Sequence, residues 1–158
     1  MVEVINGNLV ESKADVIIHQ TNCCKGFGAG VAKAIKEKWP VVAEKHFLAC
    51  DTNEKNGNPT SFLLGKIQPV NVGNGQTVIN MFAQDNFGKE NKRYTSYDAL
   101  DECLDKVKEY CIKNGFHTIA LPWKMSSDRG GANWNVVFTL IASKFEDNDD
   151  FKIEIRRL

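Results

Sequence analysis

Hydrophobic and polar positions follow two periods along this chain, one typical of strands and one typical of helices. Short runs rich in apolar and β-branched residues predict six strands. They are expected at residues 2–6, 15–18, 62–70, 76–83, 117–121 and 151–157. The first run alternates and is expected at a sheet edge, whereas the second is short and apolar, as a central strand is. The glycine- and asparagine-rich segment 71–75 predicts that the third and fourth strands form a hairpin.

Apolar residues spaced three and four apart predict four helices. They are expected at residues 31–39, 40–50, 94–114 and 134–145, with a polar loop over 51–59. In the longest helix, Thr95 with Asp98 predicts a capped start and Gly115 a stop. The resulting order, β-β-α-α-β-β-α-β-α-β, indicates one α/β domain over residues 1–158. We expect a three-layer α/β/α sandwich with a six-stranded mixed sheet.

Composition narrows the function classes. The chain has 158 residues, with 20 basic and 20 acidic side chains, and carries no basic tract. Such a balance argues against non-specific nucleic-acid binding. No apolar run is long enough to span a membrane and no signal peptide is recognisable, so we expect a cytoplasmic monomer. The five cysteines are irregularly spaced, which predicts reduced thiols.

A glycine-rich loop after the second predicted strand carries the first sign of chemistry. Gly26, Gly28 and Gly30 precede a helix that is expected to begin at Val31. Glycines allow backbone N–H groups to approach an anion, and a helix N-terminus adds a partial positive charge, so the loop is suited to phosphate. The G-x-G-x-G spacing fits neither the dinucleotide-binding fingerprint nor a Walker loop. The adjacent thiols Cys23 and Cys24 are read as loop packing, with a nucleophile as the alternative.

A second polar loop follows the fifth predicted strand. It runs from Pro122 to Trp134 and contains Ser126, Ser127 and Asp128 before two glycines. Loops at the carboxyl ends of neighbouring strands form the ligand crevice of an α/β sheet, so this loop should face the first. Its serine hydroxyls suit phosphate, whereas a carboxylate beside an anion is costly unless it acts as an acid or base or points at the sugar.

The motifs together resemble a known family. His19-Gln-Thr-Asn22, then Gly28-Ala-Gly30-Val-Ala-Lys-Ala-Ile and Trp39-Pro40, is similar to the first binding loop of macro domains, which bind ADP-ribose. The "IIH" before the loop is similar to the ADP-ribose 1''-phosphate phosphatase branch and to ADP-ribosyl-glutamate hydrolases. The second loop resembles the family's second phosphate loop, with serines and Asp128 in place of a glycine-rich triplet. The resemblance extends over nearly the whole chain.

The resemblance also implies a set of ligand-binding residues. They are Asn8, Leu9, Gly26, Phe27, Gly28, Ala29, Gly30, Val31, Ser126, Ser127, Arg129, Gly130 and Arg156. Asn8 stands where the family usually has an aspartate for adenine, and tolerance of a tight turn is the alternative. Arg156 stands where the family has an adenine-stacking aromatic residue; a solvated edge charge is the alternative.

Three residues are candidates for catalysis: His19, Asp128 and Asn22. His19 is expected at the end of the central strand, where an imidazole can transfer a proton; a core histidine is the alternative. Asp128 is the candidate acid or base, with helix capping or pairing to Arg129 as the alternative. Asn22 is expected to orient the distal ribose.

The predicted function is hydrolysis of ADP-ribose 1''-phosphate to ADP-ribose and phosphate, with no cofactor and no metal ion. An ADP-ribosyl hydrolase acting on modified protein or nucleic acid is the nearest alternative. Gln84 argues against its lysyl-adduct form, because it stands where those enzymes have lysine. A non-catalytic ADP-ribose-binding module is the third interpretation.

Overall fold

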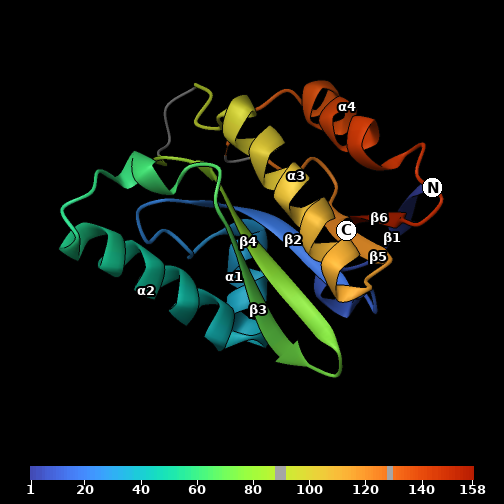
Figure 1. Ribbon diagram of the computed structural model, residues 1–158, viewed down its shortest axis with the longest axis horizontal. Coiled ribbons are helices and arrows are strands. Elements are labelled where there is room, and N and C mark those ends of the chain that lie inside the picture. The colour runs from blue at the N-terminus through green and yellow to red at the C-terminus, as the bar shows by residue number, and fades with distance from the viewer. Residues whose placement is uncertain (88–91, 128–129) are drawn as a thin grey trace.

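A six-stranded sheet forms the middle layer of the protein (Figure 1). The computed structural model describes residues 1–87, 92–127 and 130–158. The strands are β1 (Val2–Asn6), β2 (Val16–Asn22), β3 (Ile67–Gly73), β4 (Gln76–Gln84), β5 (Thr118–Pro122) and β6 (Lys152–Arg157). Their spatial order is β1-β6-β5-β2-β4-β3, and every neighbouring pair is parallel except the antiparallel β3–β4 hairpin. The predicted mixed sheet, the hairpin and the edge position of β1 are confirmed.

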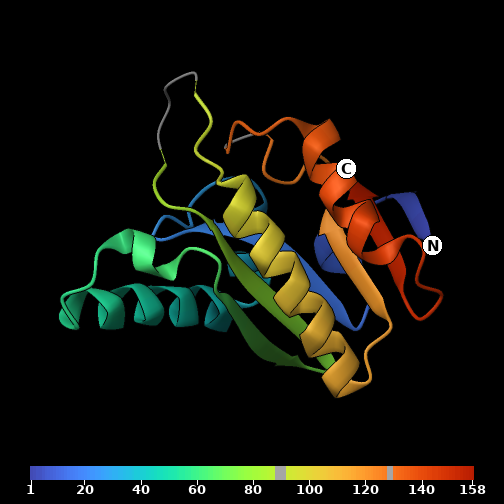
Figure 2. The same cartoon turned by 45° about the horizontal axis from the view of Figure 1, so that its top comes forward.

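In the described residues, four α-helices cover the two faces of the sheet. They are α1 (Gly30–Lys38), α2 (Pro40–Lys55), α3 (Tyr97–Asn114) and α4 (Trp134–Phe145). Figure 2 shows α2 on one side of the sheet and α3 on the other. The two larger clusters of the hydrophobic core are divided in the same way, one under α3 and α4 and the other under α1 and α2; a third, small cluster contains Cys23, Cys50, Leu63 and Phe82. The predicted three-layer sandwich is therefore confirmed.

The central strand β2 shows how the sequence determines the two layers. Val16 and Ile18 belong to the cluster under α3 and α4, whereas Ile17 belongs to the cluster under α1 and α2. Side chains on a strand alternate between faces, so a strand covered on both faces is apolar throughout. The same alternation directs His19 towards α1 and α2.

Several element boundaries differ from the prediction. Residues Thr60–Leu63 form a 3-10 turn instead of the start of β3, because Phe62 N–H donates to Pro59 O and Gly65 turns the chain at φ 85°. Helix α2 continues to Lys55 and takes in part of the predicted polar loop. Helix α3 begins at Tyr97, three residues later than predicted, because the hydroxyl of Ser96 caps it.

None of the helices in the described part of the chain is long and apolar enough to cross a membrane. The five cysteines all carry free thiols, as the sequence predicted.

Candidate functional site

Three loops meet where β2, β4 and β5 end. They are the first loop (residues 23–29), the β4–α3 loop (85–96) and the second loop (123–133). The first is joined to the β4–α3 loop by a hydrogen bond from Cys23 N–H to Asp85 O, at 3.1 Å. The second is joined to it by bonds from the N–H groups of Tyr94 and Thr95 to Gly130 O, at 2.8 and 3.0 Å. The structure thus brings the two predicted loops to one edge of the sheet.

The first loop presents open backbone at the start of α1. Gly28, Ala29 and Gly30 are exposed, and no side chain caps the helix at Ala29. The N–H groups of these three residues donate no hydrogen bond within the described part of the chain. A Cβ added to Gly28 or Gly30 would meet nothing within 4 Å, and the side chain of Val31 is 37% exposed. Unpaired N–H groups at a helix N-terminus are suited to bind an anion.

Asn22 holds the first loop in shape from beneath. Its Oδ1 accepts hydrogen bonds from Cys24 N–H and Gly26 N–H, both at 3.0 Å, and its Nδ2 donates to Gly26 O at 2.7 Å. The side chain is buried. Both polar atoms of the Asn22 side chain thus bond to the first loop, so Asn22 organises that loop. These bonds do not need the predicted contact with a ribose.

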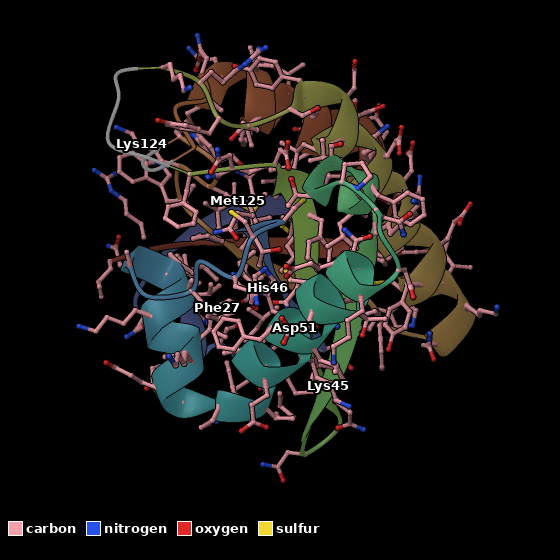
Figure 3. The ribbon with its side chains drawn as sticks, turned by 90° about the vertical axis from the view of Figure 1, so that its left-hand side faces the viewer. Phe27, Lys45, His46, Asp51, Lys124 and Met125 are labelled. Carbon is pink, nitrogen blue, oxygen red and sulfur yellow. The ribbon has the colours of Figure 1, made fainter. Side chains whose placement is uncertain are left out.

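His46, on α2, supports the same point of the chain. Its Nε2 donates to Asn22 O at 2.8 Å, which requires the tautomer with the proton on Nε2. Its ring stacks on Phe82, and Figure 3 shows Phe27 directed towards it, with ring centroids 5.2 Å apart. Burial lowers the pKa of His46, so the imidazole is neutral at physiological pH.

His19 lies inside β2 and not at its end, because the strand continues for three further residues to Asn22. Its side chain is 1% exposed, and its Nε2 donates to Asn80 Oδ1 at 2.6 Å. The ring of Phe27 covers it edge-on at 5.5 Å. Burial lowers the pKa of His19 from 6.5 to about 4; the hydrogen bond to Asn80 opposes this shift, and the nearby His46 adds a smaller lowering. The expected strand-end position was wrong, and the geometry is that of a core histidine.

The second loop is held by hydrogen bonds within the loop and to β2. Lys124 and Ser126 both adopt left-handed backbone, with φ 58° and 71°. The hydroxyl of Ser126 donates to Gln20 Oε1 at 2.5 Å, so it is not free to donate to a phosphate. The half-buried hydroxyl of Ser127 donates weakly to Met125 O, at 3.5 Å. Asp128 and Arg129, predicted for catalysis and ligand binding, lie outside the described residues.

Gly130 serves packing within this loop and not access to an anion. It is buried, and an added Cβ would lie 2.5 Å from Ser126 O and would overlap the hydroxyl of Thr95. A residue with a side chain therefore does not fit without a shift of backbone. The predicted contact between Gly130 and a ligand is therefore not supported by its buried position.

The residues predicted at the adenine end meet at one corner, beside β1 and β6. Asn8 Oδ1 accepts from Val10 N–H at 3.2 Å and caps a short 3-10 turn, and Leu9 is buried. Arg156 is paired with Glu154 at 3.0 Å, and Ser12 also donates to Glu154. The turn interpretation of Asn8 and the pairing of Arg156 account for both side chains without a ligand.

The thiols of the first loop are not arranged as nucleophiles. Cys23 is buried, and burial raises the pKa of its thiol far above the usual range. Cys24 is half-buried, and burial raises its pKa as well. A thiol that resists ionisation is a poor nucleophile, so the geometry fits the packing interpretation.

Sequence reasoning missed a network of amides and hydroxyls that joins the loops. Gln20 Nε2 donates to Gln84 Oε1 and to Thr95 Oγ1, at 3.0 and 2.8 Å. Gln84 in turn donates to Asn86 O at 2.7 Å. The signal was present in the sequence, because polar residues at the ends of apolar central strands point to the loops that follow.

Comparison with solved structures places this fold among known ones. No protein-family model and no curated protein matches the chain. A protein of unknown function from Bacteroides thetaiotaomicron superimposes with a TM-score of 0.86 at 25% identity, over 100% of this chain and 98% of that one. The macrodomain of Mycobacterium tuberculosis DarG gives 0.80 at 21% identity, over 99% and 97%. Thermosipho africanus DarTG in complex with ADP-ribose gives 0.79 at 15% identity, over 99% of this chain and 41% of that one.

Proposed function

Since the chain has the macrodomain fold, we propose that it binds ADP-ribose at the edge where its first and second loops meet. The observation that carries this proposal is the row of exposed N–H groups at Gly28, Ala29 and Gly30, which donate no hydrogen bond to the residues that the structure describes. They lie at the N-terminus of α1, where the helix dipole favours a diphosphate. The ADP-ribose complex of a neighbour with the same fold supports the choice of ligand.

The sheet order gives the ligand a direction. The corner of Asn8 and Arg156 lies beside β1 and β6, the open N–H groups follow β2, and β4 lies beyond them. A diphosphate on the first loop with adenine towards Asn8 then directs the distal ribose towards the end of β4. At this corner the guanidinium of Arg156 is held by Glu154, and its Nη1 lies 3.1 Å from the position of a Cβ built on Gly7.

We propose hydrolysis of ADP-ribose 1''-phosphate as the reaction at this site. Water attacks phosphorus, the bond between phosphorus and the ribose oxygen breaks, and that oxygen takes a proton to give ADP-ribose and inorganic phosphate. We assign to Asp128, which lies outside the described residues, the role of accepting the proton of water. We assign His19 no role in this reaction, because its side chain is buried beneath the ring of Phe27.

A binding module without catalysis is the second candidate. The observation that favours it is that His19 and Asn22, two of the three predicted catalytic side chains, are committed to the core and to the loop. An ADP-ribosyl hydrolase using a lysyl adduct is not favoured. Gln84 stands at that position, 7% exposed and bonded to Gln20 and Asn86.

The test combines calorimetric titration with ADP-ribose and a phosphate-release assay on ADP-ribose 1''-phosphate. We expect binding and release in the wild type, and loss of release with retained binding in Asp128→Asn. Asp149→Asn is the matched control, because Asp149 is exposed and lies before β6, at the other end of the strands. Binding without release establishes the binding module, and absence of binding refutes the whole proposal.

A further inference from the structure

Phe87 places an aromatic ring at the mouth of the candidate site. It follows β4, and its side chain is 53% exposed, which is unusual for a phenylalanine. Its ring lies against Gly26 of the first loop. A Cβ added at Gly26 would be 2.7 Å from Phe87 Cε1 and 2.9 Å from Cδ1. One part of the ring thus packs on backbone, and about half of the side chain remains accessible.

The segment that carries Phe87 is tied to the first loop and to β4. Cys23 N–H donates to Asp85 O at 3.1 Å, and Gln84 Nε2 donates to Asn86 O at 2.7 Å. Asn86 Oδ1 accepts from Phe87 N–H at 2.8 Å. On the other side, Asn22 fixes Gly26 through both its N–H and its carbonyl oxygen. The ring and the glycine therefore keep a defined relation to the open N–H groups of Gly28–Gly30.

The position of the ring determines which part of a ligand it meets. If the diphosphate lies on the first loop and adenine is directed towards β6, the far end of the ligand lies beside β4, where Phe87 stands. We propose that the exposed face of Phe87 packs against the distal ribose and so makes the site select ADP-ribose over ADP. This inference rests on the proposed ADP-ribose binding. The apolar C–H face of a sugar covers an aromatic ring and removes both from water.

Removing this ring has a measurable consequence. Covering half a phenylalanine side chain corresponds to about a tenfold gain in affinity. We expect Phe87→Ala to bind ADP-ribose about tenfold more weakly than the wild type. We expect its affinity for ADP to be unchanged, because ADP lacks the distal ribose. Phe87→Tyr keeps the ring and is expected to keep the wild-type preference.

Phe62 provides the matched control. It is also 53% exposed, but it lies on the turn Thr60–Leu63, and its ring is covered by the ammonium of Lys66 at 4.6 Å. We expect Phe62→Ala to bind both ligands as the wild type does. Thermal melting of each variant shows whether a lost affinity reflects lost folding. Phe87→Tyr, which keeps the ring, tests whether the aromatic ring itself is sufficient for the preference.

The experiment is calorimetric titration of the wild type and these three variants with ADP-ribose and with ADP. Equal affinity of the wild type and Phe87→Ala for ADP-ribose would overturn the role of Phe87 while leaving ADP-ribose binding in place. An equal loss for both ligands would overturn it too, because the ring would then act only on the loop. Failure of the wild type to bind ADP-ribose would refute the proposed function itself.

Discussion

The first and second loops follow neighbouring strands, yet they are built in opposite ways. The first is held from beneath by Asn22 and leaves the N–H groups of Gly28–Gly30 open. The second turns inwards: Ser126 bonds to Gln20, and Gly130 accepts from two N–H groups of the β4–α3 loop. Glycine thus serves two purposes in one site. In the first loop it provides access for an anion, whereas in the second it permits close packing.

We expect acid to cause the largest loss of stability, because the buried imidazoles of His19 and His46 pack beneath the first loop. The pKa of His19 is lowered from 6.5 to about 4, so the unfolded chain binds its proton at a higher pH than the folded chain. The stabilisation that neutral His19 contributes is complete above pH 6.5. It is lost as the pH falls towards 4, and the loss is on the order of 3 kcal/mol. Urea unfolding between pH 7.5 and 5, where most carboxylates stay ionised, measures the upper part of this loss. Stability that stays constant over that range would contradict it.

Gly130→Ala is expected to destabilise the protein by about 2 to 3 kcal/mol. The added methyl group would overlap Ser126 O and the hydroxyl of Thr95, so the second loop must move. Chemical denaturation measures the loss of stability. Gly28→Ala is the matched control, because Gly28, like Gly130, has no positive φ, and its added Cβ would meet nothing within 4 Å. A similar loss in both variants would show that close packing does not determine the cost.

Gln20→Ala tests the network between the loops. Three hydrogen bonds disappear, to Gln84, Thr95 and Ser126, and we expect a loss of about 1 to 2 kcal/mol. Amide hydrogen exchange should rise at Thr95 and Ala132, whose N–H groups bond within the joined loops. Exchange at Gly26 in the first loop should not change, since Asn22 holds it. Increased exchange in both loops would show that they form one unit.

Gly28→Ala is expected to have the smallest effect on folding, below about 0.5 kcal/mol, because its Cβ meets nothing within 4 Å. Its effect should fall on binding, with affinity for ADP-ribose reduced about tenfold as the methyl group keeps the diphosphate from the backbone. Calorimetric titration measures the affinity, and the melting temperature measures folding. Unchanged affinity would place the diphosphate elsewhere.

The fold was predictable because its strands are apolar runs and its helices are amphipathic. The pattern failed where a local hydrogen bond decided the outcome: Phe62 lies in a 3-10 turn, and Thr95 bonds to Gln20 instead of starting α3. The first loop was predicted between the correct strand and helix, but it begins at residue 23, because β2 continues to Asn22. His19 was predicted at the end of the strand because a motif does not show how far a strand continues. It lies inside β2, where its side chain is buried under the helices. Phe87 was missed because its contact with Gly26 joins residues distant in the sequence.

The placement of Phe27 between two histidines has a practical consequence. The chain has three histidines, and the Phe27 ring centroid lies 5.5 Å from that of His19 and 5.2 Å from that of His46. The magnetic field of an aromatic ring current falls steeply over such distances, so the imidazole proton resonances of both residues register any displacement of Phe27. The exposed ring of His117, which bonds to Asp150 O, supplies an internal reference. Without any label, the protein reports the state of its first loop in a one-dimensional proton spectrum.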